Sequence, residues 1–191
     1  MNRISEKIGV IASVFTLFSL GTSPHPFVLI FSYIIHEAGH IFFAKITGAG
    51  MKKIRFGAFR LCLSYDKSGL SYKQEMLVQA GGIIFNLLSA LIVLLFHLQG
   101  DVFRFFQICN ISLALMNLYP ISILDGGGIL KNVFLCFLSG GVAEKLSKFV
   151  SFIGAILMWL VAVYIQIVLS ASMSLFVISV FLLVELCFSN V

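Results

Sequence analysis

The chain has 191 residues, of which 60% are hydrophobic, 14% are aromatic and only 11% are charged. An ordinary soluble domain is about half apolar and a quarter charged, so this composition favours a polytopic membrane protein and leaves little length for a separate soluble domain. The net charge of +5 does not indicate nucleic-acid binding, because the basic residues stand between apolar stretches, where they orient membrane spans.

We predict an all-α polytopic membrane protein in which residues 1–191 form a single domain with six transmembrane helices. Each predicted span is an apolar stretch close to the roughly 20 residues that a spanning helix needs. The first stretch resembles a signal sequence, but it lacks a convincing cleavage site with small residues, so we interpret it as an uncleaved span. The six spans are residues 8–22, 27–47, 74–98, 103–121, 149–169 and 172–189.

Basic residues are concentrated in two of the connections between these spans. The connection 48–73 holds six Lys and Arg residues, and the connection after the fourth span holds Lys131, Lys145 and Lys148. Since basic loops stay on the cytoplasmic side, this pattern predicts a cell-membrane protein with both termini and both basic loops in the cytoplasm.

The second span contains His36-Glu37-Ala38-Gly39-His40, which is an H-E-x-x-H motif. Histidines four residues apart lie on one face of a helix and can bind one metal ion, while the glutamate can accept a proton from a metal-activated water. The predicted orientation puts the pair on the order of 10–16 Å from the cytoplasmic end of the span, so the site is expected to open toward the cytoplasm. Ionisable groups at such a depth are costly and mark functional sites.

The segment 53–65 alternates basic or polar residues with apolar ones, around Gly57-Ala58. This pattern predicts a small membrane-associated β-hairpin with a two-residue turn, beside the metal-binding helix. A loop that dips into the membrane interface explains the same pattern. An unpaired strand edge at this place can hold an extended peptide by β-addition.

A catalytic zinc site usually has three protein ligands, and Asp125 is the candidate for the third. It follows the helix-breaking Pro120 at the cytoplasmic end of the fourth span and precedes Gly126-Gly127. Non-helical backbone at membrane depth is tolerated where it lines a cavity or is buried in protein. Without the H-E-x-x-H motif, an ordinary helix N-cap would explain Asp125 equally well. The apolar segment 128–138 is too short to span; it continues the fourth helical region, re-enters the membrane or lies along it.

Three motifs together resemble the site-2 protease family of intramembrane zinc metalloproteases, peptidase family M50. They are HEAGH, the segment Gly82-Ile83-Ile84-Phe85-Asn86, and Asn117-x-x-Pro120 followed by Leu124-Asp125-Gly126. The resemblance covers about residues 27–130, and the overall layout is most similar to the stage IV sporulation branch. It implies one Zn²⁺ per chain held by His36, His40 and Asp125, with Glu37 as the catalytic base.

Two asparagines are candidates for holding the substrate backbone. Asn86 ends a G-x-x-x-N pattern and Asn117 precedes Pro120. For Asn86 the alternative is a hydrogen bond between helices, because small-residue spacing often marks close helix packing.

The sequence thus predicts a zinc-dependent intramembrane endopeptidase that cleaves a membrane-embedded protein substrate in or next to its transmembrane segment. The resemblance adds a sporulation-type role and a membrane-protein inhibitor or regulator. Two rivals are a membrane transporter or metal permease and a non-catalytic zinc-binding scaffold. The absence of a visible internal repeat counts against the first, and the presence of Glu37 with all three candidate ligands counts against the second.

Overall fold

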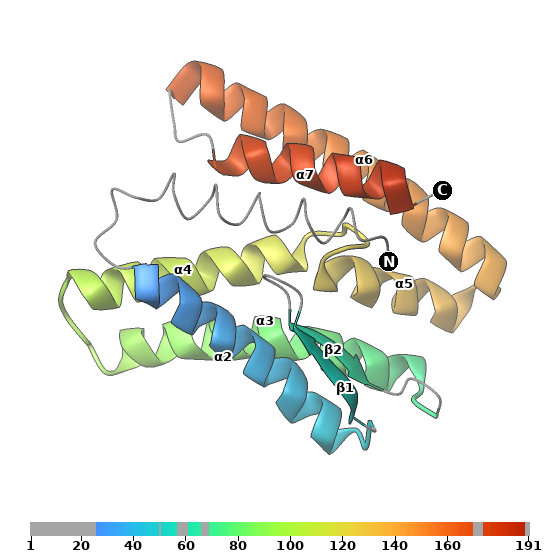
Figure 1. Ribbon diagram of the computed structural model, residues 1–191, viewed down its shortest axis with the longest axis horizontal. Coiled ribbons are helices and arrows are strands. Elements are labelled where there is room, and N and C mark those ends of the chain that lie inside the picture. Colours follow the sequence, from blue (N-terminus) through green and yellow to red (C-terminus); the bar gives the residue numbers. More distant parts are fainter. Residues whose placement is uncertain (1–25, 50, 57–60, 66–68, 170–173, 190–191) are drawn as a thin grey trace.

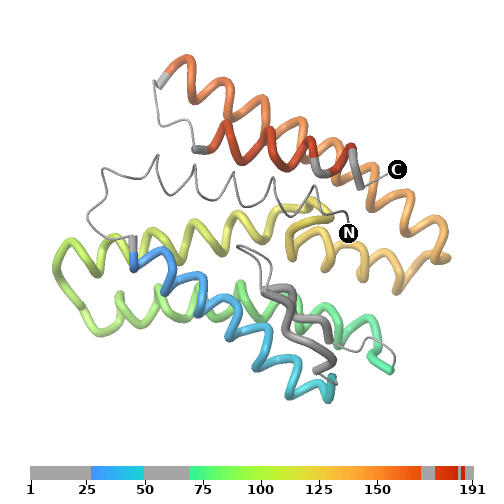
Figure 2. The backbone as a smooth tube through the Cα atoms, viewed as in Figure 1, coloured from blue at the N-terminus to red at the C-terminus, as the bar shows by residue number. Residues whose placement is uncertain are grey.

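A computed structural model describes residues 26–49, 51–56, 61–65, 69–169 and 174–189. These residues form six helices and two short strands (Figures 1 and 2). The helices are α2 (Pro26–Ile46), α3 (Tyr72–Leu95), α4 (Asp101–Leu118), α5 (Asp125–Phe137), α6 (Gly140–Leu169) and α7 (Ser174–Ser189).

Within the described part of the chain, three helices are long and apolar enough to cross a membrane: Phe27–Ile46, Tyr72–Leu95 and Gly140–Val168. They overlap the predicted spans 27–47, 74–98 and 149–169, although the third helix begins nine residues earlier, at Gly140. The other predicted spans are not confirmed. Span 103–121 corresponds to α4, which carries several polar side chains and ends at Leu118; span 172–189 corresponds to the 16-residue α7. Span 8–22 lies outside the described residues.

Strands β1 (Met51–Phe56) and β2 (Leu61–Tyr65) follow α2 and pair antiparallel, with Phe56 opposite Leu61 and Ile54 opposite Leu63. The pairing is irregular between Met51 and Lys53. The turn expected at Gly57-Ala58 lies outside the described residues. Segment 128–138, whose form the sequence leaves open, belongs to the 13-residue helix α5.

Helices α2 and α3 cross in close contact at two glycines. A Cβ atom on Gly39 would collide with the carbonyl oxygen of Gly81, and one on Gly81 would lie 2.6 Å from the carbonyl oxygen of Gly39. A real Cβ cannot fit there, so only glycine allows the backbones this close. Residues on both sides of the crossing, including His36 and His40, are therefore brought directly against α3.

The start of α3 is fixed by a capping box. The Ser71 hydroxyl accepts from the Gln74 backbone N–H, and the Gln74 side chain accepts from the Ser71 backbone N–H at 2.9 Å. Gln74 also donates to the carbonyl of Thr47, just after α2. This exchange satisfies helix-end N–H groups that have no intrahelical partner and ties the start of α3 to the end of α2.

A tight turn separates α4 from α5. Pro120 cannot continue α4 because it lacks an N–H, and the backbone N–H of Leu124 donates to the carbonyl of Ile121. The following glycines pack against this turn: Cβ atoms on Gly126 and Gly127 would collide with the carbonyls of Leu118 and Ile121. The turn and the glycines place Asp125, the first residue of α5, next to the α2–α3 crossing.

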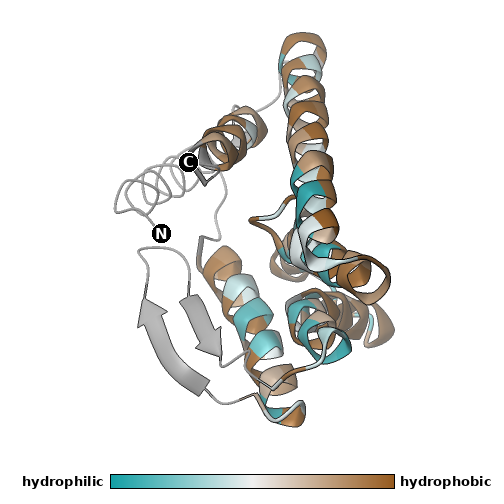
Figure 3. Ribbon diagram, turned by 90° about the vertical axis from the view of Figure 1, so that its right-hand side faces the viewer, coloured by the Kyte–Doolittle hydropathy of each residue, from teal (hydrophilic) through white to brown (hydrophobic). Residues whose placement is uncertain are grey.

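Helices α6 and α7 lie side by side and cover the α4–α5 turn (Figure 1). Ile121 is fully buried there against Ala155, Leu182 and Leu186. Hydrophobic residues cover most of the outward helix faces (Figure 3), and many large ones are exposed, such as Phe149 at 61%. A surface this apolar is expected in lipid rather than in water.

The glycine crossing gives a test of the fold. We expect Gly81→Ala to lower the free energy of unfolding by about 1–3 kcal/mol, the usual cost of overpacking, because the new methyl meets backbone atoms that cannot rotate away. Gly141→Ala is the matched control, since a Cβ on Gly141 meets nothing within 4 Å. Unfolding of both variants in detergent is the measurement, and equal stability of the two would contradict the crossing.

Candidate metal centre

The structure brings three ligand atoms from two helices into a small triangle. The Nε2 atoms of His36 and His40, both on α2, are 3.1 Å apart. The Oδ2 atom of Asp125, on α5, lies 3.1 Å from the first and 3.2 Å from the second. Among the described residues, these three form the group of histidine, cysteine and acidic side chains able to hold a metal ion. His36 is buried, and the other two are mostly buried.

The orientation of the His40 ring is set by α3. Its Nδ1 atom lies 2.8 Å from the carbonyl oxygen of Val78. A carbonyl only accepts hydrogen bonds, so Nδ1 carries the proton and donates. In a neutral imidazole this leaves the lone pair on Nε2, which faces His36 and Asp125. A hydrogen bond from the far nitrogen to a backbone carbonyl is the usual support of a metal-binding histidine.

The His36 ring is held by a close approach of the α3 backbone. A Cβ atom on Gly82 would lie 2.5–2.7 Å from three atoms of the ring, so only glycine leaves room for it. The ring of Tyr33 stacks on the same imidazole with a centroid distance of 6.4 Å. The His36 ring therefore lies between Gly82 on α3 and Tyr33 on α2, and its Nε2 atom forms one corner of the triangle.

The spacing of the three atoms matches the dimensions of a zinc site. Ligands at the corners of a tetrahedron around zinc, with bonds of about 2.0–2.1 Å, lie about 3.3 Å apart. The three atoms lie 3.1–3.2 Å apart, and the buried Oδ2 of Asp125 has no hydrogen-bond partner among the described residues, so a divalent cation between the three atoms would satisfy it. Two nitrogens and one oxygen are a common catalytic zinc set, which leaves the fourth position for water or substrate.

Glu37 follows His36 on α2 and is 7% exposed. Glu37 is not part of the ligand triangle. This position suits a residue that transfers protons beside a metal ion and does not bind the ion itself. A carboxylate buried to this degree in a membrane helix is expensive to maintain, so a functional reason for it is expected.

The two candidate substrate residues have different surroundings. Asn86 is fully buried on α3, and neither its Nδ2 nor its Oδ1 atom has a hydrogen-bond partner among the described residues. Asn117 is half-buried in the last turn of α4, where it donates to the carbonyl of Leu113 at 3.0 Å. Of the remaining histidines, His97 lies exposed between α3 and α4, away from the triangle, and His25 lies outside the described residues.

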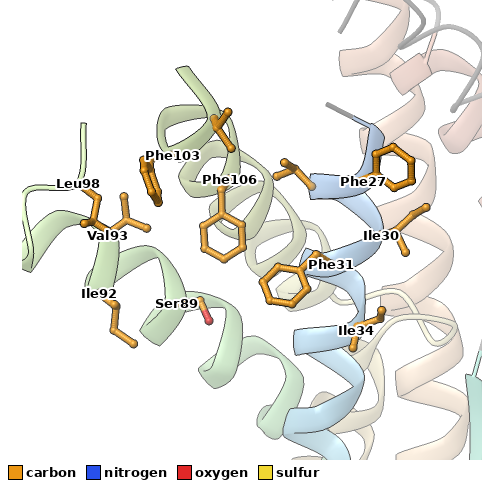
Figure 4. Close-up of a pocket in the computed structure, with 12 residues that line it drawn as sticks. Phe27, Ile30, Phe31, Ile34, Ser89, Ile92, Val93, Leu98, Phe103 and Phe106 are labelled. Carbon is orange, nitrogen blue, oxygen red and sulfur yellow. The ribbon is translucent and has the colours of Figure 1, made fainter. Parts of the chain in front are cut away.

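An apolar cavity of about 730 Å³ lies between the start of α2, the end of α3 and the start of α4 (Figure 4). Its wall includes none of the three triangle residues and holds a single hydroxyl, that of Ser89. The cavity has no group for acid–base or metal chemistry, so the candidate site remains the triangle. Representative lining residues are Phe27, Phe31, Ile34, Ile92, Phe103 and Phe106.

Some supporting residues are missing from the sequence-based predictions. The carbonyl of Val78 gives no signal in a sequence, because any residue type supplies it. Gly82 belongs to the motif that ends at Asn86, but the sequence does not show that this glycine also leaves room for the His36 ring. Asn132, buried on α5, is visible only as a polar residue in an apolar helix.

Two comparisons with known proteins found a similarity to this chain. The sequence model described as Peptidase family M50 matches residues 99–161, which include Asp125 but not the H-E-x-x-H motif. The fold is similar to that of the Site-2 Protease from Methanocaldococcus jannaschii, with a TM-score of 0.68 and 19% identity, over 98% of this chain and 88% of that one. No curated protein matches the chain significantly.

The fold and the triangle together define a membrane protein with a possible His-His-Asp metal site. Residues 99–161 match the M50 family model, and the arrangement of the helices is similar to that of the archaeal Site-2 Protease. The sporulation branch is not confirmed.

Removal of the Asp125 carboxylate tests the triangle. We expect Asp125→Ala to weaken zinc binding by more than about 100-fold, beyond the 10–100-fold typical of groups that only support a ligand. Asp101→Asn is the control, because Asp101 also begins a helix but is exposed and outside the triangle. Elemental analysis of the purified proteins is the measurement; unchanged zinc content in Asp125→Ala would exclude Asp125 as a ligand.

Proposed function

We propose that this protein is a zinc-dependent intramembrane endopeptidase that cleaves its substrate in or next to a transmembrane segment. The observation that carries the proposal is the triangle of His36, His40 and Asp125, beside a buried Glu37 in a membrane helix. The set has the composition and spacing of a catalytic zinc site with one open position. The M50 match and the site-2 protease fold support the same reaction class.

A bound zinc ion would make water a nucleophile near neutral pH and polarise the scissile carbonyl. Glu37 then accepts the proton from the attacking water and passes it to the leaving amine nitrogen. The proton of His40 is held on Nδ1 by the Val78 carbonyl, so its Nε2 lone pair faces the position of the cation. Asp125 contributes one negative charge, which offsets part of the charge of the cation.

The substrate needs to be extended at the scissile bond, because a helical peptide bond is hydrogen-bonded and covered by side chains. We propose that the β1–β2 segment pairs with the substrate by β-addition; β2 contacts α2, the helix that carries the histidines. Asn86 and Asn117 are proposed to bond the substrate backbone. The unpartnered amide of Asn86 supports its role, whereas the Asn117 amide is already bonded within α4.

The orientation and the biological setting are also proposals. The basic connection 48–73 favours a cytoplasmic location for the β1–β2 segment and for the opening of the metal site. A membrane-protein inhibitor or regulator, and a role in sporulation-type regulated proteolysis, rest on the similarity of layout to the stage IV branch.

The proton-transfer role is tested by Glu37→Gln. We expect cleavage of a membrane-embedded substrate to fall by about 10²–10⁴-fold, the usual contribution of general acid–base catalysis. Zinc content is expected to remain that of the wild type, because Glu37 is not a ligand.

Glu144→Gln is the control for this test, since Glu144 is an exposed glutamate paired with Lys148. The measurement combines a cleavage assay in vesicles with elemental analysis, and comparison of membrane-protein fragments from cells with either form identifies natural substrates. Normal turnover by Glu37→Gln would refute the role of Glu37.

The substrate role of Asn86 is tested by Asn86→Leu. Burial of an unpaired amide costs about 1–3 kcal/mol, so removing it is expected to leave the stability unchanged or raise it. Cleavage efficiency, kcat/KM, is expected to fall by about tenfold, the equivalent of one or two hydrogen bonds.

Asn110→Leu is the matched control, because Asn110 is equally buried but donates to Ser32 Oγ at 3.0 Å and to the Phe106 carbonyl. Its replacement is expected to destabilise the protein. Thermal unfolding in detergent and kinetics in vesicles separate the two residues. A large loss of stability in Asn86→Leu with unchanged kcat/KM would assign Asn86 a purely structural role.

A further inference from the structure

A buried polar contact joins α5 to α3 one to two turns beyond the ligand triangle. Asn132 on α5 is 4% exposed, and its Nδ2 atom donates to Gln79 Oε1 at 3.2 Å and to Glu75 Oε2 at 3.4 Å. Both acceptors are on α3, four residues apart. We name the three residues Asn132, Gln79 and Glu75 the amide clasp.

The clasp lies on the same side of α5 as the candidate ligand. Asn132 is seven residues after Asp125, so at 100° per residue the two side chains differ by only about 20° around the helix. Gly128, between them, faces Gln79: a Cβ on Gly128 would lie 2.8 Å from the Gln79 Cδ atom. One side of α5 therefore carries the carboxylate at its start and the clasp two turns later.

Helix α3 is the common support of all three ligand residues. Val78, next to Gln79, accepts the hydrogen bond of His40, and Gly82, three residues beyond Gln79, packs on the His36 ring. The clasp fixes α5 to this same stretch of α3. A shift of α5 by one residue moves its atoms about 1.5 Å along the axis, which is large compared with a metal–oxygen bond of about 2.0–2.2 Å.

The beginning of α5 has little other support of this kind. Its N-cap residue, Leu124, offers no side-chain hydrogen bond to the described residues. That end is otherwise held by the short turn after Pro120, the glycine contacts, and apolar packing of Ile121 and Leu124 against α6 and α7. A polar contact in an apolar interface selects one register, because every other register leaves the buried Asn132 amide without these two acceptors.

We propose that Asn132 and Gln79 are positioning residues that hold the Asp125 carboxylate at bonding distance from a metal bound by His36 and His40. The proposal rests on the proposed function for its metal, but it does not depend on peptidase activity. It predicts that loss of the clasp weakens and distorts the metal site even in the folded protein.

The experiment uses the full chain in detergent micelles, with Asn132→Leu, Gln79→Leu and the double variant. We expect each single variant to bind Zn²⁺ about 10–100-fold more weakly, measured by competition with a chelator, as found for groups that orient a ligand. The double variant is expected to lose no more than the worse single one, because both substitutions break the same contact. The visible absorption of bound Co²⁺ should change in each of them.

Gln107→Leu is the matched control, since Gln107 also donates an amide hydrogen bond between helices, to the carbonyl of Ala90 on α3 at 3.5 Å. It is expected to leave Zn²⁺ affinity and the Co²⁺ spectrum unchanged. Wild-type Zn²⁺ affinity and Co²⁺ spectra in the clasp variants, whatever their thermal stability, would overturn the proposal. If Asn132→Leu does not fold, Asn132→Ser is measured in its place with the same two outcomes.

The cleavage assay separates this proposal from the proposed function. If the wild type binds zinc and cuts no membrane peptide, the peptidase assignment fails while the Zn²⁺ and Co²⁺ measurements still decide the role of the clasp. If the wild type cleaves, the clasp variants are expected to lower kcat with KM changed less than about twofold, because they act on the metal and not on the substrate contacts.

Discussion

The contact between the backbones of Gly39 and Gly81 determines the rest of the site. It brings α3 near enough to α2 for the Val78 carbonyl to accept from His40 and for Gly82 to lie on the His36 ring. In a membrane the hydrophobic effect does not press helices together, so association depends on close packing and on hydrogen bonds between helices. The glycines at the crossing therefore allow close packing of the two helices, and through it they allow α3 to orient both imidazoles.

The candidate metal site also depends on a break between two helices, α4 and α5. Two histidines on one helix leave half of a tetrahedral shell open, and a third ligand on the same face would approach from their side. The turn after Pro120 solves this by starting α5 beside the crossing, with Asp125 as its first residue. Gly126 and Gly127 are needed because the turn folds back onto their backbone. The carboxylate thus approaches from a different direction and completes a triangle.

The sequence predicts the local parts of this arrangement better than the contacts between them. The i, i+4 spacing of His36 and His40 is enough to put both on one helix face, and the structure brings Asp125 to them as a Pro-and-Gly turn suggests. The predicted fold is less complete, because α4, with its interspersed polar residues, falls short of the hydropathy of a span and α7 falls short of the length. Backbone contacts such as that of Val78 are invisible, since they do not depend on residue type.

The buried asparagines show most clearly that contacts between helices cannot be predicted from the sequence. In the sequence, Asn86, Asn110 and Asn132 are equivalent: each is one amide in an apolar helix. In the structure the Nδ2 of Asn110 donates to Ser32 and the Nδ2 of Asn132 donates to Gln79, which offsets part of the desolvation of each amide. Asn86 has no such partner among the described residues, and in an apolar interior its unpaired amide costs free energy. In the unbound protein the Asn86 amide therefore only destabilises the fold. An extended peptide that offered it a donor and an acceptor would recover this free energy on binding, which is a physical reason for an asparagine at this position.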